Sequence, residues 1–155
     1  MIKLITPKFE ELAYKKELVV DEETMAFNHN WGGTIDFNED RWKSWYEKWI
    51  KPGDPKRFYR YIFSEELNCY VGETAYHYDD QYKGYMVDVI VHSRYRGRGF
   101  GRKTLKLLCE EAGKRGVEVL YDNIAIDNPS IRMFLDMGFK ETGRDEQFII
   151  LKRIL

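Results

Sequence analysis

An apolar stretch, residues 87–91, runs into a short turn rich in glycine and arginine, Arg96-Gly97-Arg98-Gly99-Phe100-Gly101. The residues that follow carry an apolar stripe with helical spacing, at Phe100, Leu105, Leu108 and Ala112. A strand that feeds a helix through such a turn leaves backbone N–H groups unpaired at the helix start, where the helix dipole adds positive potential. Since glycine also lets a ligand approach the backbone closely, this stretch predicts a site for a phosphate or pyrophosphate group.

Composition limits both the kind of protein and the kind of ligand. The chain has 155 residues, 43% of them hydrophobic, which is typical of one globular domain covering residues 1–155. The net charge of -1 argues against a nucleic-acid binder and favours a small anionic ligand at a local basic turn. Two cysteines form no disulfide framework, and no long apolar run or signal peptide is visible. We therefore expect a cytoplasmic protein that does not bind a membrane.

Periodicity and turn residues give the order of the elements. Short polar connectors between the strands predicted at 57–63, 69–78 and 85–92 indicate an antiparallel meander. The whole pattern predicts an α+β (α/β/α) fold, with a mixed, mostly antiparallel sheet of six to seven strands flanked by helices. The other predicted elements are strands at 2–5, 119–126, 139–142 and 148–153, helices at 9–20, 38–50, 100–115 and 129–137, and a loop at 27–34.

Two common phosphate-binding motifs fail at the same position. A dinucleotide-binding GxGxxG pattern requires a glycine at position 102, and so does a P-loop GxxxxGK[ST] pattern that starts at Gly97; the chain has Arg102 there. Lys103 and Thr104 would continue the P-loop correctly. An NTP-binding module therefore stays open as an alternative, although the antiparallel strands before the turn are unlike a P-loop core.

A third pattern, [R/Q]-x-x-G-x-[G/A] between an apolar strand and a helix, matches at every position from Arg96 to Gly101. Here the chain resembles the GNAT superfamily of acyl-CoA N-acyltransferases. The later stretch Asn128-Pro129-Ser130-Ile131-Arg132-Met133-Phe134-Leu135-Asp136-Met137-Gly138-Phe139 is similar to the second motif of that family, a short helix that ends in Gly-Phe. The resemblance implies an N-acetyltransferase with a splayed sheet and coenzyme A bound between two of its strands.

The resemblance also implies which residues bind acetyl-CoA. Backbone groups of Val89, Ile90 and Val91 would bond the pantetheine arm, and the backbone N–H groups of Arg96, Gly97, Arg98, Gly99, Phe100, Gly101 and Arg102 would hold the pyrophosphate. We infer additional charge from the side chains of Arg98, Arg102 and Lys103. The second motif would contribute Asp127, Asn128, Ser130 and Phe134. Two of these depart from the family pattern, because Asp127 stands in the slot of an asparagine and Phe134 in that of the tyrosine acid.

Acetyl transfer to an amine requires a base for the amine and a proton for the departing thiolate. Glu73 and Asp88 interrupt otherwise apolar strands, so each is either desolvated or turned toward a pocket. We favour Glu73 as the base and Asp88 as the anchor of the amine; a purely structural role for both is the alternative. His77 shares the face of Glu73 and is a reserve base. Either Tyr121, Tyr76 or water supplies the proton that Phe134 cannot, or the thiolate leaves without a proton donor.

The resemblance places the acceptor pocket among the N-terminal helices, their loop and one end of the sheet. We expect Asn28, Trp31, Trp45 and Tyr76 to line it, and these aromatic and acidic groups suit a small cationic amine. An acyl-CoA sensor with weak activity, or an acetyltransferase of a protein or peptide amine, remains an alternative. The histidines and cysteines have no metal-ligand spacing, so no metal is expected. Many relatives dimerise, which makes a homodimer a further expectation.

Overall fold

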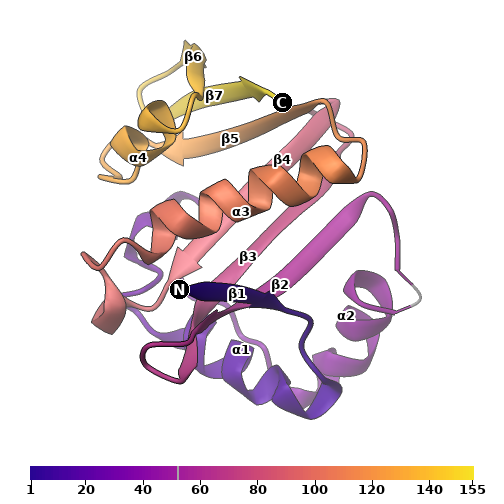
Figure 1. Cartoon of the computed structure of the whole chain (residues 1–155). Coiled ribbons are helices and arrows are strands. Elements are labelled where there is room, and N and C mark those ends of the chain that lie inside the picture. Colours follow the sequence, from indigo (N-terminus) through magenta and orange to yellow (C-terminus); the bar gives the residue numbers. More distant parts are fainter. Residues whose placement is uncertain (52) are drawn as a thin grey trace.

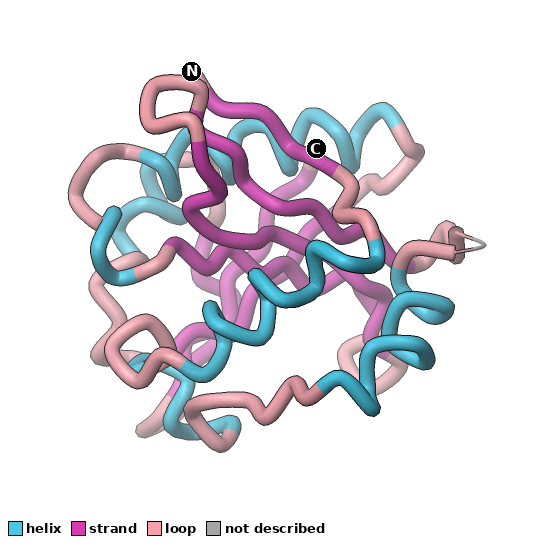
Figure 2. The backbone as a smooth tube through the Cα atoms, turned by 90° about the horizontal axis from the view of Figure 1, so that it is seen from below, coloured by secondary structure: helices cyan, strands magenta, loops and turns pink. Residues whose placement is uncertain are grey.

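The computed structural model describes residues 1–51 and 53–155, and residues 29 and 30 by their backbone alone. One twisted sheet has helices on both faces (Figure 1; Figure 2). Its strand order is β1-β2-β3-β4-β5-β7-β6. The strands are β1 (Ile2–Ile5), β2 (Arg57–Ser64), β3 (Cys69–Asp79), β4 (Gly84–Val91), β5 (Val119–Ala125), β6 (Lys140–Arg144) and β7 (Phe148–Ile154). The α-helices are α1 (Leu12–Val20), α2 (Trp42–Trp49), α3 (Phe100–Lys114) and α4 (Ile131–Asp136).

The sheet opens between its two halves. Strands β1 to β4 form the antiparallel meander that the connectors predict, and β5, β7 and β6 form a second antiparallel group. The halves meet where β4 and β5 run parallel, in register only at Tyr85↔Leu120 and Met86↔Tyr121. Beyond these pairs the two strands diverge (Figure 1). The fold predicted from the sequence is therefore confirmed, including the splay that the family resemblance implies.

The two faces of the sheet have separate apolar cores. On one face α3 and α4 pack through Leu105, Leu108 and Phe134 against Val87 and Leu120. On the other face α1 and α2 pack against β2, β3 and β4, and most of these contacts are aromatic, with Trp45 edge-on to Tyr59 at 4.7 Å. In the part of the chain that the structure describes, no helix has the length and apolar character needed to cross a membrane.

Some elements near the site differ from the sequence prediction. The predicted loop at 27–34 contains a 3-10 turn, Ala26–Trp31, held by Asn28 N donating to Met25 O at 3.0 Å. The predicted helix at 9–20 begins with a 3-10 turn, Phe9–Glu11, before α1. The α4 helix starts after Ser130 and not at Pro129, because Asn128 Oδ1 accepts a hydrogen bond from Ser130 N at 2.9 Å and holds the chain in a turn up to that point.

Candidate active site

A groove of about 440 Å³ follows the splay between the end of β4 and the starts of α3 and α4. Its walls combine backbone of the apolar strand, the glycine turn and the loop before α4. The residues that line the groove include Thr24, Asn28, Val89, Ile90, Val91, Arg96, Gly97, Gly99, Phe100, Gly101, Arg102, Asn128, Ser130 and Met133. Most of the residues that the sequence analysis assigned to the cofactor thus lie along one continuous surface.

The glycine turn has the backbone geometry that an anion site needs. Gly97 and Gly99 have φ angles of 77° and 84°, in the left-handed region that favours glycine, and Gly99 is the N-cap of α3. The first N–H groups of α3 have no partner within the helix and point out of its N-terminus. Gly101 allows close packing, since a Cβ there would lie 3.2 Å from Met133 Sδ. The turn and the helix dipole together fit a pyrophosphate group.

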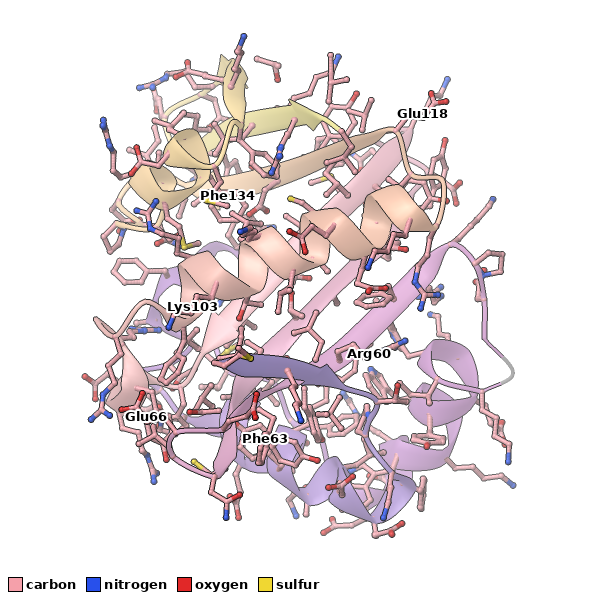
Figure 3. The ribbon with its side chains drawn as sticks, viewed as in Figure 1. Arg60, Phe63, Glu66, Lys103, Glu118 and Phe134 are labelled. Atoms are coloured by element: carbon pink, nitrogen blue, oxygen red, sulfur yellow. The ribbon has the colours of Figure 1, made fainter. Side chains whose placement is uncertain are left out.

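Two arginine side chains of this region, Arg96 and Arg102, have structural partners. Arg96 donates to the carbonyl oxygens of Thr24 at 2.6 Å and Glu23 at 3.3 Å, so it fixes the segment that forms one wall of the groove. Arg102 donates to Asp136 at 3.1 Å and ties α3 to α4. Arg98 and Lys103 are exposed and are not among the described residues that line the groove; Figure 3 shows Lys103 near the start of α3.

Two of the four residues predicted from the second motif line the groove. Asn128 and Ser130 line the groove, whereas Asp127 is exposed and outside its described lining. Figure 3 labels Phe134 on α4. Its side chain is only 3% exposed and packs edge-on against Phe139, with ring centroids 5.0 Å apart. Contact between the Phe134 side chain and the cofactor was therefore a wrong prediction, because this ring belongs to the core between α3, α4 and the sheet.

A second cavity of about 170 Å³ lies on the α1 and α2 side of the sheet. It shares Asn28 and Ile90 with the groove, so the two spaces meet at the splay. Trp31 and Trp45 line it as predicted, and Trp31 is 50% exposed at its rim. The remaining lining residues are Lys15, Met25, Gly33, Ile35, Trp49, Tyr59, Glu73, Thr74, Ala75 and Asp88. This cavity is the candidate acceptor pocket.

Glu73 lies in this cavity with every oxygen engaged. Lys15 Nζ lies 3.0 Å from Oε1 and 2.8 Å from Oε2 of Glu73, and the Tyr59 hydroxyl donates to Oε2. Glu73 is 5% exposed and Lys15 is 8% exposed. A carboxylate held by an ammonium and a hydroxyl has little capacity left to accept a proton from a substrate, so the geometry does not favour Glu73 as the base.

Asp88 is the second carboxylate of the cavity and it is open to the pocket. It pairs with Ala75 across the two strands and therefore shares the face of Glu73, and it lines the cavity; its backbone carbonyl oxygen accepts a hydrogen bond from Thr74 Oγ1 at 2.8 Å. Surrounding protein and the nearby charge of Glu73 raise the pKa of Asp88 to about 7, although Lys15 acts in the opposite direction. A carboxyl group with a pKa near neutrality can exchange protons at physiological pH.

The other candidate side chains lie away from the two cavities. Tyr76 is 1% exposed and stacks on Phe58 in the α3 core, on the opposite face of β3 from Glu73; its predicted place in the acceptor pocket was wrong. His77 packs edge-on against Trp49, and burial lowers its pKa. Tyr121 packs over Gly84, where a Cβ would lie 2.5 Å from its ring. Neither His77 nor Tyr121 is among the described lining residues of either cavity.

Sequence reasoning missed two charged residues near the site. Nothing in the sequence distinguishes Lys15 from Lys16 beside it, since both carry the same charge. Lys15 is the buried one because it pairs with Glu73, which is distant in the sequence. Asp122 stands in the middle of β5, where an acidic residue in an apolar strand was a usable signal. Burial and the nearby Asp88 raise the pKa of Asp122 well above its ordinary value. Among the described residues, no group of three His, Cys, Asp or Glu side chains is arranged to hold a metal ion.

Comparisons with solved structures give the same fold. A spermidine N-acetyltransferase from Vibrio cholerae, in complex with CoA and spermine, is 16% identical, with a TM-score of 0.80 over 99% of this chain and 95% of that chain. A putative acetyltransferase from Salmonella typhimurium with acetyl-CoA is 23% identical, with a TM-score of 0.73 over 100% and 94%. A ribosomal-protein-alanine N-acetyltransferase from Brucella melitensis is 22% identical, with a TM-score of 0.74 over 100% and 99%.

Comparison of the sequence with family models identifies the family of this chain. A search of curated proteins finds no match. The model of the acetyltransferase (GNAT) family matches residues 18–139, a range that contains the splay, the glycine turn and the second motif. Because this match covers most of the sequence, the chain belongs to the acetyltransferase (GNAT) family, an enzyme family whose co-substrate is acetyl-CoA.

Proposed function

We propose that the protein transfers an acetyl group from acetyl-CoA to the primary amine of a small molecule, by direct attack while both substrates are bound, with Asp88 as the proton acceptor. The observation that carries this proposal is the position of Asp88. Its carboxylate faces the acceptor cavity next to Ile90, which also lines the groove, and its pKa is about 7. Glu73, the other carboxylate, is already paired with Lys15.

The groove offers acetyl-CoA two kinds of backbone contact. Beyond Met86 the β4 strand is no longer in register with β5, so backbone groups of Val89 to Val91 are available to the amides of the pantetheine arm. The N–H groups of the glycine turn and the first turn of α3 receive the pyrophosphate. Asn128, which lines the groove, replaces Asp127 as the polar contact from the second motif.

When bound, acetyl-CoA supplies an activated thioester carbon. The amine nitrogen forms a bond to that carbon, the carbon–sulfur bond breaks, and its electron pair remains on sulfur. Before this attack, Asp88 takes one proton from the bound ammonium and passes it to solvent, which leaves a neutral amine. The second proton, which the nitrogen loses after the attack, goes to the departing thiolate, so the products are the acetylated amine, the CoA thiol and one proton released to solvent. Phe134 takes no part, since its ring is buried in the core.

The acceptor is a small amine in this proposal. Among solved structures of the same fold, one is a spermidine N-acetyltransferase with spermine bound and another is a ribosomal-protein-alanine N-acetyltransferase. The cavity of about 170 Å³ favours a compact free amine over a protein segment. Its aromatic wall and the carboxylate of Asp88 suit an alkylammonium group.

Two measurements test the proposal together. Calorimetry of acetyl-CoA binding compares the wild type with Gly99→Glu, in which a side chain is strained at φ 84° and a carboxylate faces the pyrophosphate. We expect a loss of affinity of at least about 100-fold, a difference of ~2.7 kcal/mol. Gly113→Glu is the matched control on α3, since a Cβ there meets nothing within 4 Å. Unchanged affinity in Gly99→Glu would contradict the groove assignment.

The second measurement is release of the CoA thiol with a panel of primary amines. The proposal predicts amine-dependent thiol release and an acetylated amine as the product. Tight acetyl-CoA binding with no thiol release for any free amine or peptide amine would instead support an acyl-CoA sensor.

A further inference from the structure

The acceptor cavity already contains a bound ammonium group, and it belongs to the chain itself. Lys15 Nζ lies 5.0, 5.2 and 5.5 Å from the ring centroids of Tyr59, Trp45 and Phe37. The same nitrogen makes hydrogen bonds of 2.8 and 3.0 Å to the two oxygens of Glu73. Aromatic rings around an ammonium, closed by a carboxylate, are the arrangement by which proteins recognise alkylammonium ligands. We name these four groups around Lys15, namely Phe37, Trp45, Tyr59 and Glu73, the ammonium cage.

The cage lies within reach of the carboxylate proposed as the base. Ala75 on β3 pairs with Asp88 on β4, so Glu73 is the diagonal neighbour of Asp88. Such neighbours have Cα atoms about 7–8 Å apart. Glu73, Lys15 and Asp88 all line the same cavity. A molecule with two ammonium groups separated by a few methylene units would therefore span from Asp88 to the cage if Lys15 were absent.

Among the described lining residues, Asp88 is one free carboxylate and Lys15 is one fixed positive charge. A second substrate ammonium would find Glu73 already paired and would approach the charge of Lys15. Apart from Asn28 and Thr74, the rest of the described lining is apolar and aromatic, with Met25, Trp31, Ile35, Trp49 and Ile90. A dry apolar cavity of about 150 Å³ accommodates a benzene molecule, so the cavity here is large enough for a compact hydrocarbon group.

We infer that Lys15 determines the substrate class: it occupies a second ammonium site, so that the enzyme accepts monoamines with a compact apolar body and discriminates against diamines. This inference rests on the proposed function, because it assigns the acceptor of that same site. It also predicts a latent specificity, since removing the Lys15 charge leaves the aromatic rings and Glu73 as an open site for the second ammonium of a diamine.

The test compares two acceptors of equal length, n-pentylamine and 1,4-diaminobutane, in which a methyl group replaces one amine. For the wild type we expect kcat/KM to be at least about 10-fold higher for n-pentylamine, which is ~1.4 kcal/mol of discrimination. In Lys15→Met we expect kcat/KM for 1,4-diaminobutane to rise by at least about 10-fold. Lys16→Met is the matched control, since Lys16 is the next residue on α1 and pairs with exposed Glu39 at 2.9 Å; it should keep the wild-type ratio.

A second variant and a second measurement keep the inference testable if Lys15→Met does not fold or if neither amine is turned over. Lys15→Gln keeps a neutral donor beside Glu73 and serves if Lys15→Met does not fold. Calorimetric Kd values for both amines give the ranking without turnover. A wild-type preference for 1,4-diaminobutane, or an unchanged ratio in a folded Lys15 variant that binds acetyl-CoA normally, would overturn the role of Lys15. The expected ranking in binding with no turnover of either amine would support the role of Lys15 and contradict the proposed function.

Discussion

The ammonium of Lys15 and the carboxylate of Glu73 form a buried pair, with Nζ 2.8 Å from Oε2, between α1 and β3. The two residues are 58 positions apart in the sequence, and the pair joins the first helix to the centre of the sheet. Removing one partner of a buried pair leaves the other charge uncompensated, which costs far more than the loss of a surface pair. The pair therefore has a structural role that is separable from catalysis.

Glu73→Gln tests that structural role. We expect its free energy of unfolding to fall by about 3 kcal/mol, because Lys15 stays buried without its counter-charge. For a domain of this size that change lowers Tm by about 6–12 °C. Glu39→Gln, which removes the exposed partner of Lys16, should cost less than about 1 kcal/mol. Equal losses in the two variants would show that the buried pair contributes no more than a surface pair.

The raised pKa of Asp88 predicts that the stability of the folded protein depends on pH. Its pKa is about 7 in the folded protein, above the ordinary value of 3.8 for an aspartate, so the folded state binds the proton more tightly. The stabilisation is therefore present at low pH and is lost as the pH rises from about 4 through about 7. Asp88→Asn removes this negative charge near Glu73. We expect its Tm to exceed that of the wild type at about pH 8.5 by more than at about pH 5. A difference in Tm that does not change with pH would contradict the raised pKa.

The stability of the protein should also depend on the ionisation of Asp122, which lies on β5, on the other side of the splay. Burial and the charge of Asp88 raise its pKa well above that of an ordinary carboxyl group, so ionisation of Asp122 destabilises the folded state at high pH. Asp122→Asn should therefore raise Tm above neutral pH, while the same change at exposed Asp127 should have no such effect. Chemical denaturation at alkaline pH measures this difference, and a loss of stability in Asp122→Asn there would contradict it.

Gly72 controls how closely β3 approaches β4. A Cβ at this position would lie 2.0 Å from the carbonyl oxygen of Ile90, which belongs to the wall shared by both cavities. Gly72→Ala must move β4, so we expect a loss of about 1–3 kcal/mol in stability, as for other overpacked sites. Acetyl-CoA affinity should fall as well. Gly143→Ala, where a Cβ meets nothing within 4 Å, is the control. Normal acetyl-CoA binding by Gly72→Ala would show that the position of Ile90 is not critical.

The sequence predicted the sheet and the groove well because their signals are local. The strand, the turn at Gly97 and Gly99, and the helix after it are consecutive, so backbone preferences alone bring them together. The meander of β2, β3 and β4 follows from short connectors. The start of α4 was misplaced by two residues because the side chain of Asn128 forms a local turn that competes with the helix.

The acceptor cavity was predicted less well because it depends on contacts between distant segments. Period-two alternation already puts Tyr76 on the opposite face of β3 from Glu73, and the structure buries it there. The role of Glu73 could not be read from the strand, since its partner Lys15 lies on α1 in a helix with a weak apolar stripe. A buried ion pair of this kind is visible only once the tertiary structure is known.

The dependence of kcat on pH in the wild type and in Asp88→Asn tests the proposed mechanism most directly. With n-pentylamine and saturating acetyl-CoA, we predict that wild-type kcat rises through the ionisation of Asp88 near pH 7. In Asp88→Asn that ionisation should disappear and kcat should fall by about 10²–10⁴-fold, with acetyl-CoA affinity unchanged. An Asp88→Asn variant that keeps both the wild-type rate and its rise near neutral pH would contradict the assignment of Asp88 as the proton acceptor.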